Sequence, residues 1–345
     1  MSGLFRFPET PFIVAEMSGN HNGSLDRALK IVEAAADAGA DAIKLQTYTA
    51  DTITLDLDTP QFRVSDDHPL WGGRKLYDLY TEAHTPWEWH EQIFNRAKKL
   101  GMVAFSTPFD ETSVDFLEEL GAPIYKIASM EIVDIPLIQR AASTKKPLII
   151  STGTASLGEI EEAVYAAREQ GCTDLTLLVC SSSYPSSPTD THLARLQELQ
   201  KLFRVRVGFS DHTIGSAVSI AAVALGAMVI EKHFTLDRSE DGVDSAFSAD
   251  PIEMLAITSG AKQAVQAIGR PDVWFTKAES ESLRLRPSLF ISTSVAAGEA
   301  VTFSNVRSVR PSGGLPPKEF FRVLGKRFRE DLPAGTPLAW AHLRS

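Results

Sequence analysis

The chain has 345 residues, a formal net charge of −10 at neutral pH, 43% hydrophobic residues and 23% charged residues. This length exceeds what one hydrophobic core usually holds, so we expect one large domain and a smaller one. The acidic balance argues against a nucleic-acid or anionic-membrane surface. Because neither a long apolar run nor a signal-peptide pattern occurs, we expect a soluble, cytoplasmic protein.

Up to about residue 270, short apolar runs rich in β-branched residues alternate with amphipathic segments. This alternation predicts parallel strands joined by helices. The predicted strands are 12–16, 42–46, 102–106, 124–127, 148–151, 175–179, 205–209 and 228–233. The predicted helices are 25–38, 86–100, 112–120, 135–142, 157–169, 192–202, 216–225 and 251–267. Eight strand–helix units predict a closed (β/α)8 TIM barrel. An open doubly wound sheet fits less well, because no Gly-rich dinucleotide motif follows the first strand.

Two regions depart from this rhythm. Residues 47–84 are too many for an ordinary connection between a strand and a helix, and a connection of that length is usually a lid or a binding loop. After about Lys277 the pattern changes to short strands and turns. We therefore expect a barrel domain over residues 1–275 and, over residues 276–345, a linker and a small β-rich domain.

Two histidines lie where neighbouring predicted strands end. His212 follows the strand 205–209, and His233 ends the strand 228–233. A helix between them would make a strand–helix–strand unit, so we expect the two strand ends side by side, with both imidazoles within reach of one metal ion. Either histidine alone would be better explained as a hydrogen-bonded structural residue. Together they favour the metal site of an enzyme.

Polar side chains end nearly every predicted strand, at the edge where barrel enzymes bind their substrates. Lys44 and Lys126 stand inside apolar runs, where a charge is costly unless it is paired. With the neighbouring hydroxyls they suit a ligand that carries phosphate and carboxylate. A Schiff-base role of Lys126 fits the same pattern. Glu16 also ends a strand, and its position allows either a structural salt bridge or proton transfer.

Several of these stretches together resemble the N-acetylneuraminate synthase family, whose members condense phosphoenolpyruvate with an amino-sugar to form nine-carbon nonulosonic acids. The stretches that carry the resemblance are Ala15–Gly23, Lys44–Thr47, Ser106–Phe109, Tyr125–Ser129, Ser151–Gly153, Ser210–Thr213 and Glu231–Leu236. The C-terminal segment resembles the antifreeze-like (SAF) domain of that family. The resemblance covers nearly the whole chain and implies a TIM barrel followed by a SAF domain.

The resemblance also implies roles for the matching positions. A divalent cation, manganese or magnesium, would be bound by His212 and His233. Phosphoenolpyruvate would be held by Lys44, Thr107, Lys126, Ser129, Ser151, Ser182 and Ser210. The amino-sugar would be bound by Gln46, Glu131, Tyr184, Asp244 and Arg310, with Arg310 reaching the partner subunit's site in a domain-swapped homodimer. The catalytic residues would be Glu16, Lys44 and Lys126.

Further motifs resemble the branch of the family that makes pseudaminic acid from 2,4-diacetamido-2,4,6-trideoxy-L-altrose. They are Gln46–Thr49, Pro69–Gly73, Leu76–Tyr80, Thr85–His90 and Asp244–Ser248. This branch implies a place in cell-surface carbohydrate synthesis, such as flagellin glycosylation. Three alternatives remain open: a sialic or legionaminic acid synthase, a Schiff-base aldolase, and a non-catalytic binding protein built on a barrel.

Overall fold

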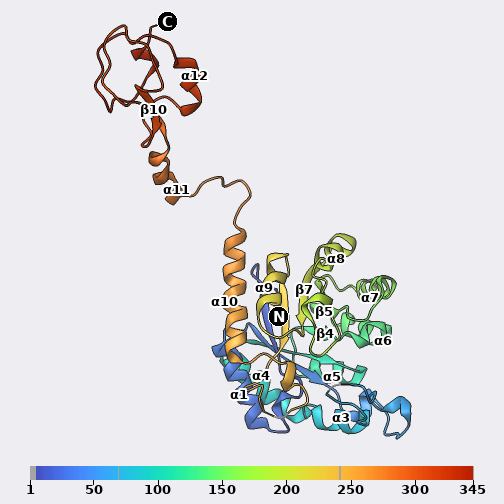
Figure 1. The fold of residues 1–345 in the computed structure, drawn as a ribbon. Coiled ribbons are helices and arrows are strands. Elements are labelled where there is room, and N and C mark those ends of the chain that lie inside the picture. Colours follow the sequence, from blue (N-terminus) through green and yellow to red (C-terminus); the bar gives the residue numbers. More distant parts are fainter. Residues whose placement is uncertain (1–4, 69, 241, 345) are drawn as a thin grey trace. The chain divides into compact units, whose positions relative to one another are not determined.

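Figure 1 shows the computed structural model of the chain, which describes residues 5–68, 70–240 and 242–344. The chain divides into two compact units, Met1–Gly269 and Arg270–Ser345. Pro69, the first residue of one motif named above, lies outside the described residues. Within the described ranges, no helix is long and apolar enough to cross a membrane.

The first unit is a closed barrel of eight parallel strands, paired in chain order with β8 beside β1. The strands are β1 Phe12–Glu16, β2 Ala42–Thr47, β3 Val103–Pro108, β4 Tyr125–Ile127, β5 Leu148–Ser151, β6 Leu175–Cys180, β7 Arg206–Asp211 and β8 Val229–His233. The predicted (β/α)8 barrel is confirmed. Its strands were found from sequence because each is buried on both faces and therefore reads as a short, almost continuous apolar run.

Helices surround the barrel (Figure 1). They are α1 Leu25–Asp37, α4 His90–Lys99, α5 Glu111–Glu119, α6 Ile135–Ser143, α7 Leu157–Glu169, α8 Arg195–Phe203, α9 Ala217–Ala224 and α10 Pro251–Ile268. Two predicted helix starts were wrong. The helix expected from residue 192 begins at Arg195, because His192 adopts a left-handed backbone conformation with φ 45°. The helix expected from residue 86 begins as a 3-10 turn, Trp87–Trp89, before α4.

The two ends of the barrel interior differ in chemistry. Near the start of the strands, the interior is filled by an apolar cluster that includes Phe12, Phe105 and Leu178. Toward the carboxyl ends of the strands, buried charged side chains replace the hydrocarbon, Glu16 and Lys44 among them. Because the apolar end is plugged, a ligand can enter only from the polar end, as in other barrels of this kind.

The long connection after β2 is built from short helices and turns. Its elements are α2 Ala50–Ile53, a 3-10 turn Pro60–Phe62 and α3 Leu76–Ala83. Several of its charged side chains pair with one another, as Arg63 with Asp58, Arg74 with Glu82 and Lys75 with Asp56. The indole N–H of Trp71 donates to the carbonyl of Val243 at 3.0 Å. This bond ties the connection to the segment that follows β8.

The second unit contains the antiparallel pair β9 Ser288–Ile291 and β10 Val306–Val309. Two short helices accompany them, α11 Lys277–Ser282 and α12 Phe320–Val323. The core of this unit is a cluster of apolar side chains such as Leu289, Ile291, Val306, Phe328 and Leu338. No charged side chain among its described residues is buried. This unit is therefore stabilised by hydrocarbon burial and backbone hydrogen bonds.

Candidate active site

Four charged side chains meet inside the barrel at its polar end. Glu16 ends β1, Lys44 lies in β2, Lys126 in β4 and Glu231 in β8, and each is at most 6% exposed. Lys44 forms an ion pair with Glu16. The Oε1 atom of Glu231 lies 3.7 Å from the Nζ atoms of both Lys44 and Lys126. Closure of the barrel thus brings together four residues from distant parts of the sequence, and their mutual pairing offsets part of the cost of burying charge.

Burial changes the protonation of this cluster. It raises the pKa of Glu16 to about 7, where Lys44 opposes the rise and Glu231 adds to it. Burial also lowers the pKa of Lys126, against the attraction of Glu231. For Lys44 the lowering by burial is outweighed by the two carboxylates, so the pKa of that ammonium lies above its usual value. A carboxyl group with a pKa near 7 can both accept and donate a proton at neutral pH.

Glu231 is a residue of this cluster for which the sequence predicted no role. Its spacing from His233 could have identified it. Glu231 stands two residues before His233, and alternate residues of a strand lie on the same face of the sheet. The intervening Lys232 instead contacts Asp211. The second carboxylate oxygen of Glu231 is buried and has no hydrogen-bond partner among the described residues. Glu231 therefore belongs to the candidate site.

The two histidines expected to bind a metal lie close together. The strands β7 and β8 are paired, and the ring centroids of His212 and His233 are 5.4 Å apart. Nδ1–H of His212 donates to the carbonyl of Ser181 at 2.9 Å, which leaves Nε2 unprotonated in the neutral ring. Nδ1 of His233 is buried without a partner in the described part of the chain. Burial holds the pKa of His233 well below its usual value.

These features suit a cation held by two neutral imidazoles. Burial acts to lower the pKa of His212, but Cys180, whose Sγ lies 3.9 Å from Nδ1, outweighs this effect and raises the pKa. A cation would therefore compete with the proton that converts this imidazole to its charged form. Across the described ranges, no group of three or more His, Cys, Asp or Glu side chains is arranged to hold a metal ion. Water or substrate oxygens would have to complete the coordination.

Two serine hydroxyls, from the segments that follow β4 and β6, lie beside Gly153, which follows β5. A Cβ atom at Gly153 would lie 2.2 Å from Oγ of Ser182 and 2.7 Å from Oγ of Ser129, so this position has no room for a side chain. Oγ of Ser151 and Oγ of Ser182 are buried and lack partners among the described residues. Buried hydroxyls usually have partners. Unpaired hydroxyls beside bare backbone suit the oxygens of an anionic ligand.

Most of the predicted site residues line one cavity at the barrel mouth. Those that line it are Glu16, Lys44, Gln46, Thr107, Lys126, Ser129, Ser151, Tyr184, Ser210, His212 and His233. Nζ of Lys44 donates to Oγ1 of Thr107 at 3.0 Å, and Nε2 of Gln46 donates to Oε1 of Glu16 at 3.0 Å. The predicted cluster is thus compact, although its roles toward substrate stay predictions.

A second cavity of about 410 Å³, here called the inner cavity, shares Gln46, Tyr184 and His233 with the first. Asp244 also lines it, and its carboxylate accepts a hydrogen bond from the Gly19 N–H at 3.2 Å. Two predicted sugar-binding residues are not among its lining residues. Glu131 lies in the 3-10 turn Met130–Val133, and Arg310 follows β10 in the second unit, where its side chain is exposed.

Comparison with known proteins agrees with this geometry. The chain matches the NeuB family over residues 31–272 and the SAF domain over residues 286–344. A pseudaminic acid synthase of Campylobacter jejuni subsp. jejuni serotype O:2 is 43% identical over 336 residues, which are 97% of this chain and 97% of that protein. An N,N'-diacetyllegionaminic acid synthase of the same organism is 37% identical and covers 92% and 97%. The crystal structure of an N-acetylneuraminic acid (sialic acid) synthetase from Leptospira borgpetersenii serovar Hardjo-bovis in complex with citrate gives a TM-score of 0.70 at 33% identity. It covers 80% of this chain and 90% of that one.

Proposed function

The chain belongs to the NeuB family and carries a SAF domain, and from that premise we propose that it acts as a pseudaminic acid synthase. The family resemblance that the motifs predicted is confirmed. The observation that carries the proposal is the identity of 43% over nearly the whole length of a pseudaminic acid synthase, against 37% for a legionaminic acid synthase. The proposed substrates are phosphoenolpyruvate, 2,4-diacetamido-2,4,6-trideoxy-L-altrose and water.

In the proposed reaction, C3 of phosphoenolpyruvate forms a bond to the aldehyde carbon of the open-chain sugar, and the aldehyde oxygen takes up a proton. Water adds at C2 and loses a proton. The bond between C2 and the phosphate oxygen then breaks. One phosphoenolpyruvate, one sugar and one water thus give one nine-carbon acid and one phosphate.

The buried lysines are proposed to bind and orient the anionic substrate. Lys44 and Lys126 direct two ammonium groups into the cavity, while Glu231 lies 3.7 Å from each and keeps part of that charge compensated before the substrate binds. The phosphate would lie beside Gly153, against Ser151 and Ser182, whose unpaired hydroxyls would then gain acceptor oxygens. Fixing one reactant in this way supplies proximity and orientation for the new carbon–carbon bond.

Glu16 is proposed to move the proton. It contacts Lys44 and Gln46, and its pKa of about 7 allows the carboxylate to accept a proton from the attacking water or to return one. A carboxylate at this position also stabilises positive charge that develops at C2. Lys44 holds the carboxylate in place through the ion pair, so a single group would serve both tasks.

A divalent cation, manganese or magnesium, is proposed to be held by His212 and His233, and when bound it would draw charge from the aldehyde oxygen. The donor set fits, because both rings can present an unprotonated nitrogen and Nδ1 of His233 has no partner among the described residues. The Ser181 carbonyl fixes the tautomer and orientation of His212.

The direct test is release of inorganic phosphate from phosphoenolpyruvate, measured side by side with the altrose substrate, the legionaminic acid precursor and N-acetylmannosamine. We expect the altrose substrate to give the highest kcat/KM. Treatment with a chelator should abolish release, and manganese should restore it. A higher kcat/KM with either of the other two sugars would overturn the assignment of the sugar, and full activity after chelation would overturn the cation.

A Schiff-base aldolase is the second candidate, because burial lowers the pKa of Lys126 and so favours a nucleophilic amine. Borohydride reduction in the presence of substrate would trap an imine on Lys126, and the peptide that contains it would gain the mass of the substrate less one oxygen atom, because imine formation releases water and reduction adds two hydrogens. We expect no such adduct, since the synthase reaction needs Lys126 only as a charge.

Arg310 is proposed to act across the two subunits of a homodimer. We expect a homodimer in which the exposed Arg310 of one subunit reaches the sugar site of the other, in a protein of the cytoplasm that serves cell-surface carbohydrate synthesis. Arg310→Ala should mainly raise KM for the sugar. Mixing Arg310→Ala subunits with Glu16→Gln subunits should restore activity in the mixed dimers, and a monomer in solution would contradict the expectation.

A further inference from the structure

One side of the inner cavity is an apolar wall made by the long connection after β2. The side chains of this wall, as we define it, are Tyr48, Val64, Trp71, Leu76, Leu79, Tyr80 and Ala83, of which only the two tyrosines carry a hydrogen-bonding group other than the indole N–H of Trp71. The charged residues of the same connection, such as Arg74 and Lys75, pair with Glu82 and Asp56 and do not line this cavity. The connection therefore offers the cavity mainly hydrocarbon and aromatic surface, with the phenol hydroxyls of Tyr48 and Tyr80 and the ring of His68, and no carboxylate, ammonium or guanidinium group among the described lining residues that it contributes.

His68 also lines the inner cavity, yet its hydrogen-bonding capacity is partly used within its own turn. Nδ1 of His68 accepts hydrogen bonds from the backbone N–H groups of Leu70 and Trp71, at 3.3 and 3.2 Å, and its ring stacks on Trp71 with centroids 4.7 Å apart. The polar groups on the barrel side are Gln46, His233 and Asp244. The cavity thus has a polar side from the barrel and a mostly apolar side from the connection.

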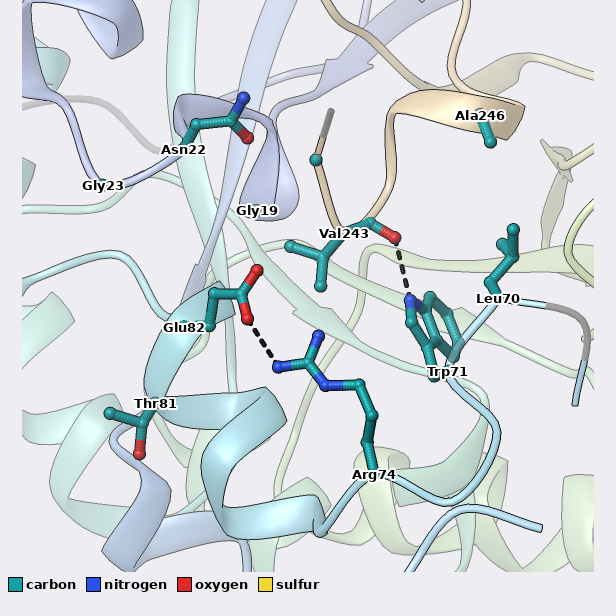
Figure 2. A pocket seen from close by; sticks show the side chains of 11 residues that line it. Gly19, Asn22, Gly23, Leu70, Trp71, Arg74, Thr81, Glu82, Val243 and Ala246 are labelled. Carbon is teal, nitrogen blue, oxygen red and sulfur yellow. Dashed lines mark hydrogen bonds and ion pairs between the residues drawn. The ribbon is translucent and has the colours of Figure 1, made fainter. Parts of the chain in front are cut away.

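Trp71 lies between the inner cavity and a third cavity, here called the outer cavity. The outer cavity, of about 600 Å³, is lined by polar groups that include Asn22, Arg74 and Glu82. Trp71 and Val243 line both cavities. Figure 2 shows the outer cavity, with the indole bonded to the carbonyl of Val243 and with Arg74 and Glu82 paired across it. Trp71 is therefore held in place as the partition between polar and apolar space.

The wall lies at the far end of the proposed sugar position. From His233, ring contacts lead to Phe247 at 5.0 Å and on to Trp71 at 6.4 Å, and Tyr184 lies 6.2 Å from Trp71. A six-carbon chain whose aldehyde lies at the histidine pair would direct its last carbons toward these rings. A methyl group there gains contact with hydrocarbon, whereas a hydroxyl would leave water without gaining a charged partner from the connection.

We propose that this wall, and Trp71 above all, makes the enzyme selective for amino-sugars whose sixth carbon is a methyl group rather than a hydroxymethyl group. The inference rests on the proposed function, and it assigns to the long connection the task of distinguishing 6-deoxy from 6-hydroxy substrates. An apolar site discriminates against an added hydroxyl only moderately, by about tenfold to a hundredfold. The wall recognises a methyl group and does not by itself distinguish the altro from the manno configuration.

The test compares two sugars that differ in one oxygen atom, 2,4-diacetamido-2,4,6-trideoxy-L-altrose and its 6-hydroxy analogue, by phosphate release at saturating phosphoenolpyruvate. We expect the unaltered protein to favour the 6-deoxy sugar by about tenfold to a hundredfold in kcat/KM. Trp71→Ala, which removes the partition, should reduce the ratio to below about threefold through a higher KM for the 6-deoxy sugar. KM for phosphoenolpyruvate should stay unchanged. Val64→Thr, which keeps the shape and adds a hydroxyl, should lower the ratio in a fold that is less disturbed.

Leu57→Ala is the matched control, because Leu57 belongs to the same connection, is 46% exposed and does not line the inner cavity. It should keep the parental ratio. Equal kcat/KM for the two sugars in the unaltered protein, or a parental ratio in both wall variants, would overturn the proposal. If the protein instead uses another hexose, the proposed function fails separately, and the same comparison with the 6-deoxy and 6-hydroxy forms of that hexose still decides the role of the wall.

Discussion

The barrel buries two clusters of charge that lie on opposite faces of β8. The inner cluster consists of Glu16, Lys44, Lys126 and Glu231. The outer pair consists of Asp211 and Lys232, 3.0 Å apart and at most 1% exposed. Asp211 also accepts hydrogen bonds from the N–H and hydroxyl of Thr213 and from the hydroxyl of Ser219 in α9. The outer pair therefore faces the helices and is satisfied by the protein itself.

The inner cluster is different, because some of its polar atoms and those of its neighbours have no partner among the described residues. These atoms are Oε2 of Glu231, Nδ1 of His233, Oγ of Ser151 and Oγ of Ser182. An unsatisfied buried polar atom costs free energy, so a folded protein retains a group of them where a ligand will supply the missing bonds. Burial alone does not identify a site. A site is indicated by buried polar atoms that lack hydrogen-bond partners within the protein.

The largest expected effect of a single change lies in the inner cluster. Glu16→Gln removes the group proposed to transfer a proton, so phosphate release should fall by about a thousandfold. The melting temperature and the binding of phosphoenolpyruvate should stay close to those of the parent, since the amide keeps the shape of the side chain. Turnover within threefold of the parent would show that Glu16 is structural, like Asp211.

The outer pair should show the opposite pattern. Lys232→Met leaves Asp211 buried without its countercharge and should lower the free energy of unfolding by about 3–5 kcal/mol in urea denaturation. Adding Asp211→Asn should recover much of this loss, because the amide carries no charge. Lys201→Met is the control, since Lys201 is largely exposed in its pair with Glu198 and should change stability by less than about 1 kcal/mol. A Lys232→Met protein as stable as the parent would remove the distinction between the two clusters.

His90 is a third kind of buried titratable group, because its ring has hydrogen-bond partners but forms no ion pair with any described residue. Its Nε2 lies 2.9 Å from the hydroxyl of Thr47, and its Nδ1 lies 3.2 Å from the carbonyl of Pro86. Burial lowers the pKa of His90 to about 4. The unfolded chain therefore binds more protons between about pH 6.5 and 4, and the stability from neutral His90 is complete above pH 6.5 and lost as the pH falls.

The expected size of this loss is on the order of 3 kcal/mol at pH 4 relative to pH 7. Urea denaturation of the parent and of His90→Gln at several pH values isolates it, because other titrating groups cancel in the difference. A difference in stability between the two proteins that stays constant over this range would contradict the low pKa of His90.

The smallest expected effect concerns the serines around Gly153. Gly153→Ala places a Cβ atom against Ser182 and Ser129, so KM for phosphoenolpyruvate should rise by about tenfold, in line with about 1–2 kcal/mol of overpacking. Gly158→Ala is the control, because Gly158 lies in α7 and its nearest contact would be 4.0 Å away. Equal KM values in both variants would show that the serines do not hold the phosphate.

The barrel could be predicted from the sequence because each of its strands and helices follows from a pattern of neighbouring residues. Each strand is a short apolar run, and each helix has apolar residues at helical spacing, as α1 does with Ala28, Ile31, Val32 and Ala35. The errors fell where local sequence is ambiguous. The left-handed conformation of His192 shortened one helix, and a 3-10 turn preceded α4. Lysines within apolar runs likewise marked Lys44 and Lys126 as residues of the site.

Sequence alone thus determined the fold class, the histidine pair and the lysines, because these follow from which residues stand in or at the end of a strand. Only the tertiary structure showed that Glu231 joins the site while Lys232 turns outward, and that Trp71 separates two cavities. The reason is physical. Contacts such as the one between Trp71 and Val243 join segments 172 residues apart, and their geometry exists only after the barrel has closed.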